Sequence, residues 1–124
     1  MTNPRTAVLL ADAGKGGAVG YALCAPMSLP YAAALPGAVE LKRLYVDAAA
    51  QGRGLGRRLL AAAVDWAVAQ RAPEVYLGVY CENFGAQRLY AAHGFAKVGE
   101  YAFAVGRHRD HEFILRRPLG PPGV

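Results

Sequence analysis

The 124-residue chain has a mass of 13.1 kDa, 54% hydrophobic and 19% charged residues, and a formal net charge of +5. These values predict one globular domain, exclude a wholly disordered chain, and favour anionic partners. No apolar run approaches the roughly 20 residues that span a bilayer, so we expect no membrane segment. No signal peptide is visible, and the two cysteines lack metal-ligand spacing, which predicts a cytoplasmic protein without a metal site.

Apolar patterning and turn residues predict eight elements within a single domain of residues 1–124, with a core at 6–119 and a flexible tail at 120–124. In chain order these elements are strands at 6–12, 18–25 and 39–46, a helix at 54–71, a strand at 75–80, a helix at 84–93, and strands at 95–105 and 112–117.

Local signals refine these boundaries. The glycine-rich sequence Gly-Lys-Gly-Gly at residues 14–17 predicts a turn, and the polar residues at 106–111 predict a second turn. Broken alternation at Lys42 and Arg43 predicts a β-bulge, and Asn83 is expected to cap the helix at 84–93. The alternation of strand, helix and strand predicts a parallel pair, and the outer hairpins predict antiparallel edges. The fold class is therefore α/β, with a mixed sheet flanked by helices.

A glycine- and arginine-rich segment at residues 51–58 follows a strand and opens a helix. Glycines allow a backbone to approach a ligand closely, and a helix N-terminus attracts phosphate oxygens. Arg53, Arg57 and Arg58 add positive charge at the same place. The segment therefore predicts a pyrophosphate-binding loop.

The segment also has three other interpretations. A dinucleotide fingerprint starting at Gly52 requires glycine at position 57, where the chain has Arg57, although Glu74 lies where a ribose-binding acid would be. A Walker A loop requires a Gly-Lys-Ser/Thr sequence, which the chain lacks. The third interpretation is an ordinary connector between a strand and a helix.

Two motifs give the chain a family resemblance. Gln51-x-x-Gly54-x-Gly56, after the strand ending at Val46, resembles the acetyl-CoA signature of the GNAT acyltransferase superfamily. The segment from Tyr80 to Phe95 resembles the second signature of that superfamily. The resemblance extends over about residues 6–119, and the segment at 98–115 is weakly similar to the spermidine/diamine-acetyltransferase-like branch. It implies a splayed sheet, and this chain is expected to depart from the superfamily by lacking its usual N-terminal strand and two helices.

The resemblance also implies a set of acetyl-CoA-binding residues. The pantetheine arm is expected on the backbone of residues 44–46, and the pyrophosphate on the glycine loop. The implied cofactor-binding residues are Leu44, Tyr45, Val46, Gln51, Gly52, Arg53, Gly54, Leu55, Gly56, Arg57, Asn83 and Tyr90. A backbone N–H within residues 43–45 is the expected oxyanion donor.

Amine acetylation needs a base for the amine and an acid for the departing thiolate. By resemblance, Tyr90 is the acid, and Glu40 on the cofactor strand is the best candidate base, with Glu82 as second choice. The structural alternatives are a core aromatic for Tyr90, a helix cap for Asn83 and a solvated strand-edge carboxylate for Glu40. Cys81 is a further, weaker candidate as a nucleophile.

The leading hypothesis is an acetyl-CoA-dependent N-acetyltransferase acting on a primary amine of a small molecule or peptide. The alternative is a non-catalytic CoA-binding or regulatory module of the same fold. A basic nucleic-acid-binding domain is disfavoured, because the arginines gather at a glycine loop and the sheet has no aromatic ladder. Only residues 1–5 precede the first strand, so we expect an uncovered apolar sheet face and a homodimer.

Overall fold

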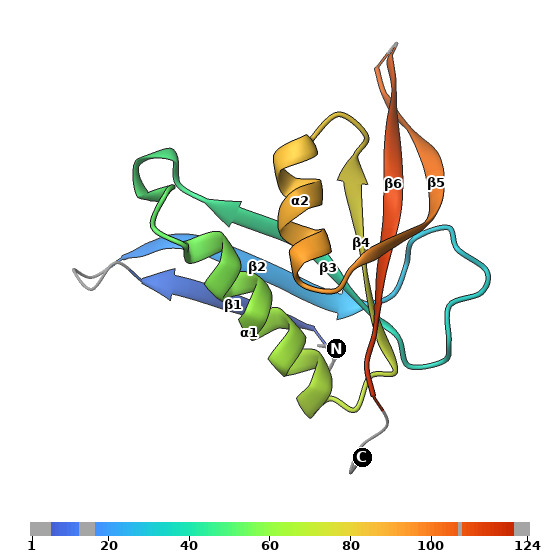
Figure 1. Cartoon of the computed structure of the whole chain (residues 1–124), viewed down its shortest axis with the longest axis horizontal. Coiled ribbons are helices and arrows are strands. Elements are labelled where there is room, and N and C mark those ends of the chain that lie inside the picture. The colour runs from blue at the N-terminus through green and yellow to red at the C-terminus, as the bar shows by residue number, and fades with distance from the viewer. Residues whose placement is uncertain (1–5, 13–16, 107, 121–124) are drawn as a thin grey trace.

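The computed structural model describes residues 6–12, 17–106 and 108–120, which form one mixed sheet and two α-helices (Figure 1). In chain order the elements are β1 (Ala7–Asp12), β2 (Ala18–Pro26), β3 (Val39–Val46), the 3-10 helix η1 (Ala48–Ala50), α1 (Leu55–Ala69), β4 (Glu74–Tyr80), α2 (Phe84–Ala92), β5 (Ala96–Val105) and β6 (His108–Pro118). The strand order across the sheet is β1-β2-β3-β4-β6-β5. The predicted element order and fold class are confirmed.

Two local predictions have different outcomes. The bulge is confirmed, because the β2–β3 register passes from Leu23↔Arg43 to Cys24↔Leu41 and leaves out Lys42. The polar turn at 106–111 is wrong, because β6 already begins at His108. The β5–β6 hairpin projects beyond the rest of the sheet (Figure 1), so its charged residues remain in solvent while the backbone pairs. Residues 14–16 of the predicted turn and 121–124 of the predicted tail lie outside the described residues.

The sheet opens between β3 and β4. These parallel strands share only the register pairs Val39↔Val75 and Glu40↔Tyr76. Figure 1 shows the two strands diverging after this short contact. The backbone of β3 beyond Glu40 therefore has no strand partner on the side of β4, which leaves its hydrogen-bonding groups available to a ligand.

Helix α1 packs on one face of the sheet through leucine, alanine and valine side chains at helical spacing. The buried positions are Leu59, Leu60, Ala63, Val64 and Ala67. They form the main core with apolar residues of β2, β3 and β4. Gly20 on β2 permits this close packing, because a Cβ atom there would lie 2.6 Å from the Tyr45 carbonyl oxygen and 3.3 Å from Leu59 Cδ1.

A second, smaller core lies on the opposite face of the β4–β6–β5 half of the sheet. Tyr76 and Ile114 are buried there beneath the loop between β2 and β3. Leu29 and Tyr31 from that loop pack against them, and the Tyr31 and Tyr76 rings lie 5.5 Å apart. The proline-rich loop is therefore an ordered part of the fold.

Glu74 on β4 connects this loop to the sheet by a hydrogen bond. Its side chain is only 1% exposed, and its Oε2 accepts a 2.9 Å hydrogen bond from the Leu35 N–H and another from the Tyr76 hydroxyl. Arg116 Nε donates to Glu74 Oε1 at 2.6 Å. Burial alone would raise the pKa of Glu74, but these donors and the Arg116 charge outweigh it and lower the pKa below 4.5.

We expect Glu74 to stabilise the fold in a pH-dependent way. A carboxylate with a lowered pKa contributes stability above its ordinary pKa and loses it as the pH falls through the folded-state value. Glu74→Gln should therefore lower the free energy of unfolding by about 2 kcal/mol at pH 7, and the difference should shrink below about pH 4. Urea unfolding of both proteins at pH 7 and at pH 3.5 checks this. A difference that is independent of pH would contradict the role given to the Glu74 charge.

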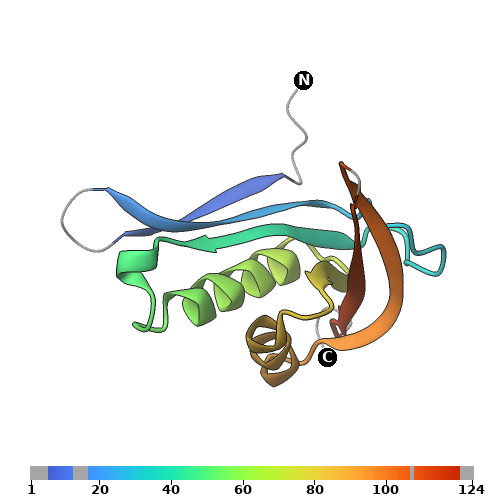
Figure 2. The same cartoon turned by 90° about the horizontal axis from the view of Figure 1, so that it is seen from above.

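Both α-helices lie on the same side of the sheet, as Figure 2 shows from above. The other face of β1–β3 therefore carries exposed apolar side chains. Val8 is 58% exposed, Leu10 is 67% exposed and Tyr45 is 51% exposed, with the Tyr45 ring 5.8 Å from that of Tyr21. We call this surface the open face. Neither α-helix in the described part of the chain is long and apolar enough to cross a membrane.

Candidate active site

Helix α1 begins on a glycine instead of a capping side chain. Gly52 and Gly54 have φ angles of 84° and 76°, in the left-handed region that favours glycine. No side chain caps the helix at Gly54, and a Cβ atom built on either glycine meets nothing within 4 Å. The first N–H groups of α1 therefore lie beside open space, an arrangement suited to phosphate oxygens.

A cavity of about 560 Å³ lies between this helix start, the end of β3 and α2. Its lining residues are Leu44, Val46, Gln51, Gly52, Gly54, Leu55, Gly56, Arg57, Asn83, Ala86, Leu89 and Tyr90. It therefore brings together all the predicted cofactor-binding residues except Tyr45 and Arg53. We call it the central cavity.

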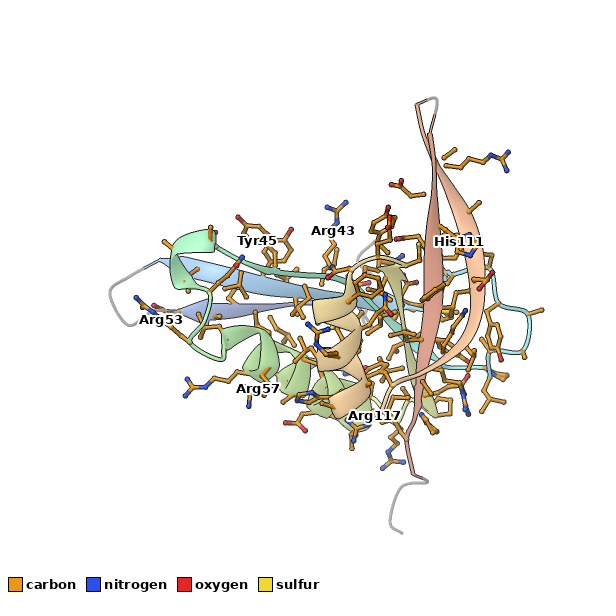
Figure 3. The ribbon with its side chains drawn as sticks, turned by 45° about the horizontal axis from the view of Figure 1, so that its top comes forward. Arg43, Tyr45, Arg53, Arg57, His111 and Arg117 are labelled. Carbon is orange, nitrogen blue, oxygen red and sulfur yellow. The ribbon has the colours of Figure 1, made fainter. Side chains whose placement is uncertain are left out.

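A second cavity of about 650 Å³, the basic cavity, adjoins the central one at Gly52, Gly54 and Arg57. Its other lining residues are Arg53, Arg58, Ala61 and His93. Figure 3 shows Arg53 and Arg57 at the N-terminal end of α1. Three guanidinium groups and the positive end of the helix dipole make this region favourable for an anion.

Tyr45 is the predicted cofactor residue whose side chain lies elsewhere. It extends from β3 away from α1 (Figure 3) and belongs to the open face. Only its backbone can face the gap between β3 and β4. On the cavity side of the same strand, Gln51 Nε2 donates a 3.0 Å hydrogen bond to the Val46 carbonyl, which fixes the loop against the strand end.

Tyr90 on α2 faces the central cavity from a half-buried position. Its ring packs edge-on against Phe95, with centroids 6.0 Å apart. Burial raises the pKa of Tyr90 above its ordinary value of 10, so the phenol keeps its proton at neutral pH. The side chain is thus both a core contact and a proton-bearing group at the cavity.

Asn83 caps α2, because its Oδ1 accepts a 3.2 Å hydrogen bond from the Ala86 N–H. The predicted helix cap is confirmed. Since the amide nitrogen of Asn83 is not used in this cap, the residue can also donate to a ligand in the central cavity.

Glu40 lies on the face opposite the central cavity, at the point where β3 and β4 diverge. It is only 6% exposed, so its interpretation as a solvated strand-edge carboxylate is wrong. Its Oε1 accepts hydrogen bonds from the Ser28 N–H at 3.0 Å and the Ser28 hydroxyl at 2.9 Å. Lys42 Nζ lies 3.7 Å from the same oxygen.

The other two candidate catalytic residues, Cys81 and Glu82, directly follow the end of β4. Glu82 Oε2 accepts a 2.6 Å hydrogen bond from the Tyr80 hydroxyl, and this bond raises the pKa of Tyr80 to about 12. Cys81 is a free thiol whose N–H donates to the His111 carbonyl. His111 lies on β6, where its Nε2 is 2.9 Å from Glu100 Oε1 (Figure 3). Within the described ranges, no three potential ligand side chains cluster to hold a metal ion.

Four cavity-lining residues were missed from the sequence. Ala86 and Leu89 line the central cavity, and Ala61 and His93 line the basic cavity. The helical period marks Leu89 as one turn from Ala86, so that pair was accessible to pattern analysis. His93 lies at the end of α2, where its Nδ1 donates a 3.0 Å hydrogen bond to the Leu89 carbonyl.

Comparison with known sequences identifies related acetyltransferases. A model described as the acetyltransferase (GNAT) family matches residues 2–95. An uncharacterized N-acetyltransferase of Mycobacterium bovis is 35% identical over 123 residues, covering 96% of this chain and 71% of that protein. A spermine/spermidine N(1)-acetyltransferase of Bacillus subtilis is 37% identical over 68 residues, covering 54% of this chain and 45% of that protein. This second match reaches less than half the length of its relative.

Solved structures share the architecture. A ribosomal-protein-alanine N-acetyltransferase from Brucella melitensis has a TM-score of 0.80 and 26% identity, covering 92% of this chain and 69% of that chain. A GNAT family acetyltransferase from Elizabethkingia anophelis with acetyl-CoA bound has a TM-score of 0.74 and 17% identity, covering 93% of this chain and 77% of that chain. The open mixed sheet is common to all three proteins.

Proposed function

The chain belongs to the acetyltransferase (GNAT) family, and we propose that it transfers the acetyl group of acetyl-CoA to a primary amine of a small molecule or peptide. The observation that supports this proposal is the central cavity, which lies between the uncapped start of α1 and the edge of β3 that is not paired with β4. The helix start is suited to phosphates, and the β3 edge can pair with an extended, amide-bearing arm.

The two cavities support a placement for the whole coenzyme. The pyrophosphate would lie on the first-turn N–H groups of α1, at residues 52–57. The pantetheine arm would pair with the β3 backbone at residues 44–46. The 3′-phosphate would lie in the basic cavity, where Arg53, Arg57 and Arg58 provide cationic partners.

Glu40 and Tyr90 would supply the two proton transfers from opposite sides of the gap. Glu40 removes a proton from the amine, directly or through water, and the nitrogen attacks the thioester carbonyl carbon. The C–N bond forms, the C–S bond breaks, and the departing thiolate takes the Tyr90 hydroxyl proton. Glu40 then releases its proton to water, and the Tyr90 phenolate takes a proton from water. A backbone N–H within residues 43–45 would stabilise the oxyanion.

The test measures thiol release from acetyl-CoA with two acceptors, spermidine and a short peptide with an N-terminal alanine. We expect an acetylated amine by mass spectrometry for at least one acceptor. Glu40→Gln should lower kcat about 100-fold, the scale of one general base, with unchanged coenzyme affinity. Coenzyme binding without transfer to either acceptor would instead favour the non-catalytic module, and no coenzyme binding would contradict both functions.

We also propose that the chain forms a homodimer through the open face. Val8, Leu10 and Tyr45 together expose an apolar surface of the kind that protein interfaces cover. Sedimentation should give twice the 13.1 kDa chain mass at micromolar concentration, and Leu10→Lys should yield the single-chain mass. A wild-type protein that sediments as a single chain would contradict the dimer. The proposed compartment is the cytoplasm, which is compatible with the free thiols of Cys24 and Cys81.

A further inference from the structure

We infer that Ser28 is a positioning residue, which fixes the carboxylate of Glu40 so that one oxygen is held and the other faces the amine acceptor. This inference rests on the proposed function, in which Glu40 is the base. It concerns a residue in the loop between β2 and β3, outside both family motifs and both cavities.

Ser28 binds Glu40 through two donors at once. Its N–H and its hydroxyl donate to Glu40 Oε1 at 3.0 Å and 2.9 Å. Lys42 Nζ donates to the Ser28 hydroxyl oxygen at 2.6 Å. Since an ammonium group can only donate, the serine oxygen must accept from Lys42, and its single proton is left for Glu40. The direction of each hydrogen bond in this chain is therefore determined.

The other carboxylate oxygen of Glu40 remains available. Within the described residues, both hydrogen bonds that the Glu40 side chain makes end on Oε1. Because no buried side-chain oxygen in that part of the protein lacks a partner, Oε2 must be in contact with solvent. A side chain that is 6% exposed thus presents one accessible oxygen, at the point where β3 leaves β4.

The charged and titratable groups around Glu40 come from three strands. Lys42 on β3 lies 3.7 Å from Oε1. On β4, Tyr76 is the register partner of Glu40, but its hydroxyl donates to Glu74. On β5, burial and the nearby carboxylates of Glu112 and Glu40 raise the pKa of Tyr101, so it faces Glu40 as a neutral phenol. Two hydrogen bonds from Ser28 are therefore the direct restraint on the carboxylate.

The position of Ser28 is itself fixed by the ends of its loop. Met27 N–H donates to the Ala38 carbonyl at 3.1 Å, and Leu35 N–H donates to buried Glu74. These bonds close the loop immediately beside Ser28 and near its far end. The serine donors are thus in place before any ligand binds, which is the requirement for a positioning residue.

The structural part of the inference can be tested without an acceptor. Ser28 is the only serine among the 124 residues, so ¹⁵N-serine labelling should give one amide resonance, identified by its loss in Ser28→Ala. We expect its amide proton at neutral pH to lie further downfield in the wild type than in Glu40→Gln, because a hydrogen bond to a carboxylate is stronger than one to a neutral amide. The same amide proton shift in both proteins would overturn the contact.

The functional part uses the acetyl-transfer assay with spermidine or the alanine peptide. Ser28→Ala should lower kcat about tenfold, the scale of one hydrogen bond to a charged group, with unchanged KM for acetyl-CoA. In the Glu40→Gln background, Ser28→Ala should cause little further loss of kcat, because the serine acts through the Glu40 carboxylate. Ser28→Thr keeps the hydroxyl and should restore the wild-type kcat.

The outcomes separate this inference from the proposed function. A lowered kcat in Glu40→Gln together with a wild-type kcat in Ser28→Ala would leave the base in place and overturn the role of Ser28. Failure of Ser28→Thr to restore activity would do the same, because it would assign the loss to the loop structure. An inactive wild type would remove the base role, and the positioning role would fail with it even if the Ser28 amide proton shift depends on Glu40.

Discussion

Gly56→Val is expected to weaken coenzyme A binding about 100-fold while the fold persists. Gly56 is the second residue of α1 and lines the central cavity. A Cβ atom there meets only Leu89 Cδ2 at 4.0 Å, so the protein has room for a side chain. A branched side chain would separate the phosphates from the helix N–H groups, and two lost charge-assisted hydrogen bonds account for this magnitude. Isothermal titration calorimetry with coenzyme A measures the effect.

The matched control is Gly85→Val. Gly85 is likewise the second residue of its helix, α2, and its Cβ atom would meet only a flexible Arg88 nitrogen at 3.9 Å. It does not line the central cavity, so it reports the cost of valine in a helix without blocking the site. Equal coenzyme affinities in the two variants would move the pyrophosphate away from the start of α1.

Tyr90→Phe is expected to lower kcat about 100-fold, the scale of one general acid. The change removes only the hydroxyl, so the edge-on packing with Phe95 and the coenzyme affinity should persist. Because burial raises the pKa of Tyr90 above 10, the wild type should keep this acid protonated up to at least that pH. Steady-state rates from pH 6 to pH 10 measure both effects.

Tyr21→Phe provides the control for loss of a tyrosine hydroxyl. Tyr21 lies on the open face, with its ring against Tyr45 and away from the central cavity. Its kcat should match the wild type. If Tyr90→Phe gives the same kcat as Tyr21→Phe, Tyr90 has only the role of a core aromatic.

Features that depend on local sequence were predictable. The bulge at Lys42, the cap at Asn83 and the uncapped glycine start of α1 each follow from a few adjacent residues. The start of β6 could not be predicted, because the run of arginine, histidine and aspartate at 107–111 lacks apolar alternation. The strand conformation of β6 at its start comes from pairing with β5, which no local pattern in the sequence of 107–111 encodes.

The environment of Glu40 in the candidate site could likewise not be predicted from local sequence. From the sequence, Glu40 is a polar residue in a strand, and Ser28 lies twelve positions away in a proline-rich loop. The loop folds over β4 and brings the two residues into contact. Burial of Glu40 thus depends on long-range packing, whereas the glycine–arginine segment could be interpreted from adjacent residues alone.

The two-pair contact between β3 and β4 divides the sheet into half-sheets with different freedom. One half is β1–β3 and the other is β4, β6 and β5, and within the described residues strand pairing joins them only at Val39↔Val75 and Glu40↔Tyr76. In the free protein, amide protons of β3 that face this seam are open to exchange with deuterium, unlike those paired with β2. A ligand arm laid along the seam would close it as an additional strand does. Ligand binding would then be detected as slower amide deuterium exchange at alternate residues of β3.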